Sequence, residues 1–235
     1  MLAIIDYGSG NLRSVAKAFE RVAAGGQEVR VVRPAEALTE ASHIVLPGVG
    51  AFADCMAGLS AIPGMTDALE EQAIGQKKWF LGICVGMQML FTRGHEHGMH
   101  KGLGWLKGEV VALVPSPVGG GLGRGLSGKD SLRSAPLPAS PLWGEEILKI
   151  PHMGWNELAI EKKHPLPEGV ESGAHAYFVP RYHAMCGDHT DLLATAAYGQ
   201  TIAAVVGRDN IMGTQFHPEK SQETGLALLK NFWSL

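Results

Sequence analysis

The chain of 235 residues has the composition of a globular protein. Hydrophobic residues make up 46% and charged residues 18%, a balance that excludes disorder along most of its length. The length allows one large domain with a well-buried core but is short for two independent enzymatic domains. A formal net charge of -3 leaves no basic field that would attract nucleic acid, so we expect no nucleic-acid partner.

The N-terminal segment and the cysteines indicate a compartment. The segment reaches the acidic Asp6 and has neither a basic region nor a long apolar run, so it does not predict a signal peptide. No apolar run is long enough to predict a membrane helix. The chain has three cysteines at wide separations, Cys55, Cys84 and Cys186. Their odd number and their spacing match neither a disulfide framework nor paired metal ligands. We therefore expect a cytoplasmic protein with no membrane association, no metal and no cofactor.

Short β-branched runs alternate with helix-period segments in the first half of the chain. Strands are predicted at residues 2–6, 29–32, 44–46 and 79–83. An apolar stripe predicts a helix over residues 11–24, with Ser9 or Asn11 as its cap, and a weaker helix follows over residues 67–74. This alternation predicts a parallel sheet flanked by helices.

The second half is richer in strands, which are predicted at residues 110–114, 176–179, 192–197, 202–206 and 211–216, before a helix at about 223–233. We expect some of them to be antiparallel. The predicted fold class is α/β, with a mixed, mostly parallel sheet, flanking helices and an antiparallel extension. Open α/β sheets bind ligands at the carboxyl ends of their strands, so we expect the site after Leu46, Ile83 and Phe216.

Residues 115–145 interrupt this pattern. Gly, Pro and Ser dominate them, and such a stretch cannot bury a core. We interpret them as a surface insertion between two strands of a single domain, 1–235, and expect truncation to be tolerated. Residues 123–130 imitate a phosphate-binding loop, but no predicted strand precedes them and no predicted helix follows.

A cluster of histidines raises the alternative of a metal site. His95, Glu96, His97 and His100 carry metal-binding side chains within six residues of one another. They lie in a Gly-rich polar stretch without predicted secondary structure to set the ligand geometry. We therefore do not predict a metal site there.

Residues 79–89, W-F-L-G-I-C-V-G-M-Q-M, have the spacing of a nucleophile elbow. In such an elbow a strand turns sharply into a helix and presents one side chain, here Cys84. Gly82 and Gly86 leave room for the crossing, and a helix beginning near Val85 directs backbone N–H groups and a positive dipole at the sulfur. Both features favour the reactive thiolate, and the Val85 N–H is a candidate oxyanion donor.

A thiolate also needs a group that protonates the leaving amine and later activates water. Of ten histidines, His217 is best placed, because it follows an apolar strand. Pro218 prevents helix there, and extended geometry puts Glu219 on the same side, where it orients the imidazole. The turn at residues 47–50 exposes backbone amides that complete an oxyanion hole or, alternatively, form a plain strand-to-helix turn.

These residues resemble the class I, triad-type glutamine amidotransferases, which have a flavodoxin-like fold. Within that family the chain is similar to the glutaminase subunits of imidazole glycerol phosphate synthases over nearly its whole length. The similarity is carried by D-Y-G-S-G-N-L-R-S-V at Asp6, L-P-G-V-G-A-F at Leu46, G-I-C-V-G-M-Q at Gly82, P-H-M-G-W-N at Pro151, Y-F-V at Tyr177 and Q-F-H-P-E-K-S at Gln215.

The resemblance implies a mechanism and a substrate site. Cys84 attacks the side-chain amide of glutamine and forms a glutamyl thioester. His217, held by Glu219, protonates the departing ammonia and then activates the water that releases glutamate. The resemblance also implies which residues contact glutamine or the oxyanion: Gly48, Gly50, Val85, Gln88 and Tyr182.

The resemblance also implies a heterodimer with a cyclase subunit, a (β/α)8 barrel. Ammonia passes to this subunit, which makes imidazole glycerol phosphate and aminoimidazole carboxamide ribotide (AICAR) in histidine biosynthesis. The resemblance places four residues toward the interface: Asn11, Trp155, Tyr177 and Lys220. Their alternative interpretations are, in the same order, a helix cap, a core aromatic, a strand residue and a solvated charge.

The sequence departs from the family after Y-F-V, where the family places His and a small hydroxyl residue. Here Pro180 and Arg181 precede Tyr182, and Pro180 removes a backbone donor from a segment that faces the amino-acid end of glutamine. Three alternatives remain: a glutaminase subunit of another synthase, a non-catalytic flavodoxin-like binding protein and a free-standing cysteine hydrolase. The motifs at Asp6 and Pro151 favour the imidazole glycerol phosphate synthase branch.

Overall fold

The structure is a computed structural model that describes residues 1–23, 27–114, 151 and 153–235. The predicted insertion at 115–145, with its loop at 123–130, lies outside the described residues. The main sheet has the strand order β2-β1-β3-β4-β14-β13-β12-β9. Its strands are β1 (Leu2–Ile5), β2 (Val29–Val32), β3 (His43–Gly48), β4 (Trp79–Cys84), β9 (Ala159–Ile160), β12 (Leu192–Ala197), β13 (Thr201–Arg208) and β14 (Ile211–Thr214).

Two kinds of pairing divide this sheet. The neighbours from β2 through β1, β3 and β4 to β14 are parallel, whereas β14, β13, β12 and β9 pair antiparallel. The mixed sheet with an antiparallel extension is therefore confirmed. All residues of β1 and β3 are buried, as expected for parallel strands that are covered on both faces.

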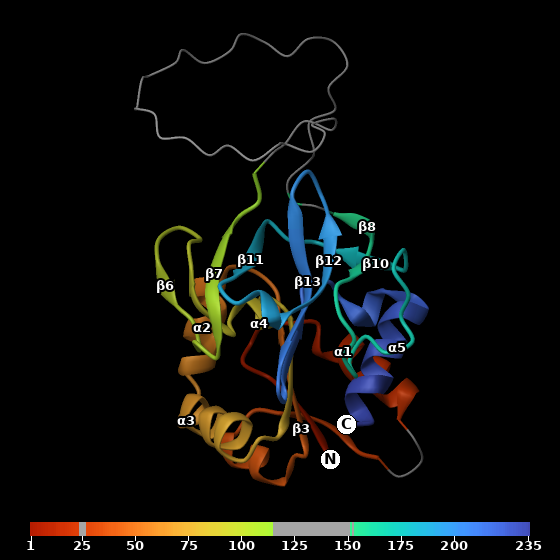
Figure 1. Cartoon of the computed structure of the whole chain (residues 1–235). Coiled ribbons are helices and arrows are strands. Elements are labelled where there is room, and N and C mark those ends of the chain that lie inside the picture. Colours follow the sequence, from red (N-terminus) through yellow and green to blue (C-terminus); the bar gives the residue numbers. More distant parts are fainter. Residues whose placement is uncertain (24–26, 115–150, 152) are drawn as a thin grey trace, which may run out of the picture.

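Helices cover the two faces of the parallel part. Figure 1 shows α1 (Leu12–Val22) and α5 (Gln222–Trp233) on one side and α2 (Phe52–Ser60) and α3 (Met65–Leu69) on the other. The first pair meets through aromatic side chains, with the Phe19 ring 5.7 Å from the Trp233 ring.

The helices of the structure differ from the predicted ones in three ways. The pattern did not predict α2, although Phe52, Cys55 and Leu59 bury a helical stripe. The helix predicted at 67–74 begins at Met65 as α3 and continues as a π-helix, Glu70–Gly75. Asn11 occupies the cap position of α1 without a side-chain cap hydrogen bond, and the Ser9 hydroxyl is bonded to Val49 instead.

Two smaller sheets complete the described fold. One has the order β11-β7-β5-β6 and the other pairs β10 with β8. The strand predicted at 110–114 is the end of β7, which begins earlier. No helix in the described ranges has the length and apolarity of a membrane span. The strands of these sheets are β5 (Phe91–Gly94), β6 (His100–Lys101), β7 (Leu106–Ala112), β8 (Gly154–Glu157), β10 (His175–Phe178) and β11 (Tyr182–Cys186).

Candidate active site

The carboxyl ends of β3, β4 and β14 meet at one edge of the main sheet. Gly48 at the end of β3 is aligned with Cys84 at the end of β4, and Thr214 at the end of β14 is aligned with Ile83. His217 follows β14 after two residues. Residues that are far apart in the sequence are thereby gathered at the sheet edge where ligands of α/β folds bind, as the sequence predicts.

Cys84 occupies a sharp turn between β4 and α4 (Val85–Gln88). Its backbone has φ 56° and ψ -112°, a conformation that non-glycine residues rarely adopt and that is typical of strained functional turns. The crossing leaves no room for side chains: a Cβ on Gly86 would lie 1.8 Å from the Leu46 carbonyl oxygen. The predicted elbow is present, with the helix beginning at Val85 as expected, but α4 is a single turn, so its dipole is small.

His217 and Glu219 form a buried pair beside this turn. His217 Nδ1 and Glu219 Oε1 are 2.9 Å apart, and the two side chains are 4% and 1% exposed. The prediction that they lie on the same side is confirmed. The backbone is extended at His217, as expected, but not from Pro218 on. A 3-10 turn, Pro218–Lys220, joins them, because the fixed φ of proline suits the first position of a helical turn.

The environment of His217 changes its protonation. Burial lowers the pKa of the imidazole, but contacts with Cys84 and Glu219 outweigh burial and raise this pKa to about 9. The ring is therefore protonated at neutral pH. The protonated ring lies next to the Cys84 side chain. It also holds a proton that a leaving group needs.

A cavity of about 350 Å³ opens at Cys84. Four of the predicted substrate residues line it, whereas Gly48 is buried in β3 and is not part of the lining. Its lining comprises Val49, Gly50, Cys84, Val85, Gln88, Glu96, Pro151, Val179, Pro180, Arg181, Tyr182 and His217.

Gln88 is held in this cavity by two hydrogen bonds. Its Nε2 donates to the Tyr182 carbonyl oxygen at 2.9 Å and to Gln215 Oε1 at 3.0 Å. The Gln215 amide nitrogen in turn lies 3.9 Å from the Cys84 sulfur. The network orients the Gln88 side chain and connects the elbow to β14 and β11.

The backbone amides near Cys84 differ in their availability. Val85 is the first residue of α4, so its N–H has no acceptor within the helix. The Val49 N–H, in contrast, donates to the Ser9 hydroxyl oxygen at 3.1 Å. The Ser9 hydroxyl donates to the Val49 carbonyl oxygen at 2.5 Å. The turn after β3 thus presents one of its amides to Ser9 in this structure.

Two charged residues of the cavity were not predicted as site residues. Glu96 Oε2 accepts a hydrogen bond of 2.7 Å from the Phe52 N–H at the start of α2. Arg181 was noted only as a departure from the family pattern. Neither residue follows a predicted parallel strand, so sequence position alone carried no signal for them.

The histidine cluster near Glu96 is divided between different partners. His95 Nε2 lies 2.6 Å from Glu109 Oε2 on β7, whereas Glu96 faces the catalytic cavity. No group of three or more His, Cys, Asp and Glu side chains in the described residues is arranged to hold a metal ion. The alternative of a metal site therefore has no geometric support there.

Three of the four predicted interface residues lie together next to His217. The Trp155 and Tyr177 rings are 5.9 Å apart, and Lys220 Nζ lies 5.9 Å from the Tyr177 ring. Trp155 is 45% exposed, which excludes a core aromatic. Asn11 is also exposed, at the start of α1. Exposed aromatic surface of this kind is typical of a protein-protein contact.

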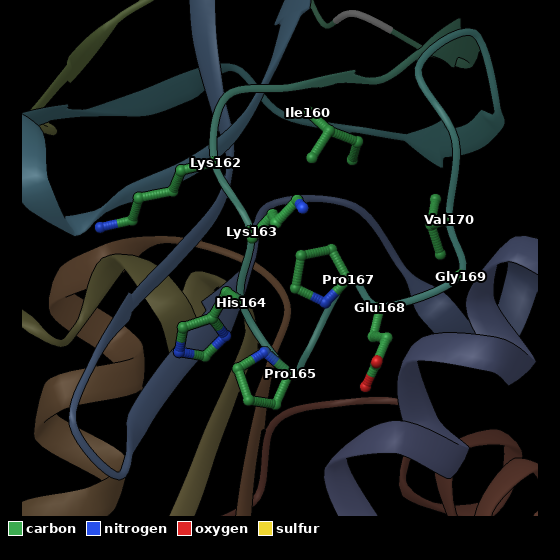
Figure 2. Close-up of a pocket in the computed structure, with 9 residues that line it drawn as sticks. All are labelled: Ile160, Lys162, Lys163, His164, Pro165, Pro167, Glu168, Gly169 and Val170. Carbon is green, nitrogen blue, oxygen red and sulfur yellow. The ribbon is translucent and has the colours of Figure 1, made fainter.

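A second cavity, of about 550 Å³, shares no lining residue with the catalytic one. Figure 2 shows that it is formed by the loop after β9, with Lys162, Lys163 and Glu168 among its side chains. His164 is the imidazole there, and burial lowers its pKa. This cavity contains no cysteine, so the candidate active site is the cavity at Cys84.

Comparison with known proteins decides the family. The model of the family "Glutamine amidotransferase class-I" matches residues 3–235. The chain belongs to this family. Two solved structures share the amidotransferase fold: "Crystal structure of glutamine amidotransferase" (TM-score 0.64, 17% identity, 98% of both chains) and a putative GMP synthase subunit from Thermoplasma acidophilum (TM-score 0.63, 16% identity, 99% of this chain and 92% of that chain).

Curated relatives of this amidotransferase are similar over nearly their whole length. The protein named imidazole glycerol phosphate synthase subunit HisH from Rhodospirillum rubrum is 46% identical, over 98% of this chain and 97% of the relative. The protein of the same name from Agrobacterium fabrum is 47% identical with the same coverage. The family and the flavodoxin-like α/β fold expected from the sequence are therefore confirmed.

Proposed function

We propose that the chain is the glutaminase subunit of an imidazole glycerol phosphate synthase and hydrolyses glutamine to glutamate and ammonia. The observation that carries this proposal is the buried His217–Glu219 pair beside the strained Cys84 elbow, in a chain that is 46% identical to a HisH subunit. Cys84 is the proposed nucleophile, His217 the acid and base, and Glu219 the residue that orients His217.

The proposed reaction has two halves. The Cys84 thiolate attacks the side-chain amide carbon, and the C–N bond breaks as His217 gives its proton to the departing ammonia, leaving a glutamyl thioester. Neutral His217 then takes a proton from water while the water oxygen attacks the thioester carbon. The C–S bond breaks, glutamate leaves and the thiolate with its imidazolium is restored.

The oxyanion of both tetrahedral intermediates requires backbone donors. We assign the Val85 N–H to this role, because it follows the nucleophile and has no helical acceptor. The turn of Gly48, Val49 and Gly50 supplies the second contact. In this structure the Val49 N–H is bonded to Ser9, so its contribution requires that this hydrogen bond be released.

Glutamine fits the charges of the cavity. Glu96 has one oxygen occupied by the Phe52 N–H and carries a negative charge that matches an α-ammonium group. Gln88 and Tyr182 line the same cavity and are joined by a hydrogen bond, and in our proposal they contact the chain of the substrate.

The proposed partner is a cyclase subunit that takes up the ammonia and makes imidazole glycerol phosphate and AICAR. We place the contact at Asn11, Trp155, Tyr177 and Lys220, because the exposed Trp155–Tyr177 pair and Lys220 adjoin the turn that holds His217. We propose the cytoplasm as compartment, since a cysteine nucleophile must stay reduced.

We propose that the chain is a single glutamine amidotransferase domain, 1–235, with the insertion at 115–145. Its main sheet combines the first strand of the chain with the last one, so the two halves share one core. A glutaminase subunit of another synthase has no specific observation in its favour, because relatives of 16–17% identity indicate the fold alone. A relic without catalysis does not explain why Cys84, His217 and Glu219 meet.

The test is glutamate release from glutamine by the purified chain, with and without a cyclase from the same source and its nucleotide ligand. Cys84→Ser serves as the blank. Strong release only in the complete mixture supports the proposal. Equal release by the chain alone would favour a free-standing hydrolase, and no release in any mixture would contradict the proposal.

A further inference from the structure

One cation of the catalytic cavity has no role in the proposed reaction. Arg181 lines the cavity and is exposed to solvent. Its guanidinium group makes no hydrogen bond or ion pair to another side chain within the described ranges. A strongly basic group at the mouth of a substrate cavity is thus available for an anionic ligand.

The backbone that carries Arg181 is held firmly. Its carbonyl oxygen accepts a hydrogen bond of 2.9 Å from the Leu113 N–H, and the next residue, Tyr182, is aligned with Ala112 in the β11–β7 pair. On the other side, Pro180 has a fixed φ. The side chain is therefore presented from a rigid base, which lowers the entropy cost of binding a ligand.

The local sequence changes which donors an anion would meet. Pro180 has no N–H, so the segment at 179–181 lacks one backbone donor. The Arg181 guanidinium has five N–H donors in a planar arrangement that matches a carboxylate. The Arg181 side chain therefore brings hydrogen-bond donors to a segment whose backbone lacks one.

Two charged residues of opposite sign line the cavity. Glu96 is its carboxylate and Arg181 its guanidinium, while the head of glutamine is a zwitterion. We infer that the Arg181 guanidinium binds the α-carboxylate of glutamine while Glu96 binds the α-ammonium group. Arg181 is then a specificity-determining residue that selects α-amino acids over simple amides. This inference rests on the proposed glutaminase function.

The test uses the complex with the cyclase and its nucleotide ligand. KM and kcat for glutamine are measured for the natural chain, Arg181→Met and Arg181→Lys, with Arg33→Met as a control for loss of an exposed arginine outside the cavity. We expect Arg181→Met to raise KM roughly tenfold or more, as for a lost charge-assisted hydrogen bond, with kcat changed less than about threefold. Arg181→Lys restores part of the loss, because it keeps the charge but not the planar fork.

Direct binding separates this inference from catalysis. Glutamine is titrated calorimetrically into complexes of Cys84→Ser, with and without Arg181→Met, and Kd is expected to rise by the same factor as KM. Unchanged KM and Kd in Arg181→Met would overturn the inference. An unchanged KM together with weaker binding of the cyclase would also overturn it and would assign Arg181 to the interface. If the natural chain releases no glutamate while Kd still depends on Arg181, the catalytic proposal fails and the binding inference stands.

Discussion

The Ser9 hydroxyl bridges both polar groups of the Val49 residue, accepting from its N–H at 3.1 Å and donating to its carbonyl oxygen at 2.5 Å. Val49 lies in the turn after β3 and lines the cavity that contains Cys84. A side chain from the loop before α1 therefore holds an amide of a residue that lines the same cavity as Cys84. The hydrogen bond connects that loop to the chemistry proposed for the turn.

Substitution of Ser9 tests this connection. In Ser9→Ala the Val49 N–H loses its acceptor and is free to turn toward the oxyanion. One oxyanion donor is worth roughly 10²–10³ in kcat, so we expect the turnover of glutamine without the cyclase to rise several-fold. The measurement is glutamate release by the isolated chain, with the exposed Ser60→Ala as control. Unchanged turnover in Ser9→Ala would show that this amide does not limit the reaction.

Glu219→Gln tests the orienting role of the carboxylate. The amide keeps the size of the side chain but removes the charge next to His217 Nδ1, so the imidazolium is less stable and its pKa falls below about 9. We expect kcat with the cyclase to fall by about 10²-fold or more. Steady-state kinetics and an NMR titration of His217 measure the two effects. The control is Glu223→Gln, at an exposed residue of α5. Full kcat in Glu219→Gln would refute the orienting role of Glu219.

The raised pKa of His217 predicts a pH dependence of stability. The folded pKa of about 9 exceeds the ordinary value of 6.5, so protonation of His217 stabilises the folded state. This contribution is complete below pH 6.5 and is lost as the pH rises through about 9. Each pKa unit corresponds to about 1.4 kcal/mol.

Urea unfolding at a series of pH values measures this contribution. The difference in free energy of unfolding between the natural chain and His217→Asn is expected to shrink between about pH 6 and about pH 10. Groups that do not interact with His217 cancel in that difference. A constant difference over this range would contradict the raised pKa.

Gly86→Ala tests the steric basis of the elbow. The added Cβ would lie 1.8 Å from the Leu46 carbonyl oxygen, so β3 or α4 must move. We expect a loss of roughly 1–3 kcal/mol or more in stability and loss of glutaminase activity. Gly75→Ala is the matched control, because its nearest neighbour is the flexible Glu71 carboxylate at 3.2 Å. Equal stability of the two variants, measured by urea unfolding, would show that the crossing tolerates a side chain.

The local pattern of the chain was sufficient to predict the elbow at Cys84, the pairing of His217 with Glu219 and the class of sheet. The elbow spacing around Cys84 and the His-Pro-Glu run at His217 are short motifs, and both carry their own backbone requirements. Strand rhythm likewise predicted the parallel sheet and its antiparallel extension. These features depend on neighbours within a few residues, and such neighbours are visible in a sequence.

Contacts between distant segments were decided only by the tertiary structure. Glu96 follows β5 and Arg181 precedes β11, and the pairing of both strands with β7 brings the two residues to the cavity of Cys84. Ser9 meets Val49 because β1 and β3 are neighbours in the sheet, and the 3-10 turn after His217 replaces the extended chain expected from Pro218. A local pattern predicts the shape of its own segment, but the distance between two such segments depends on the packing of the whole sheet.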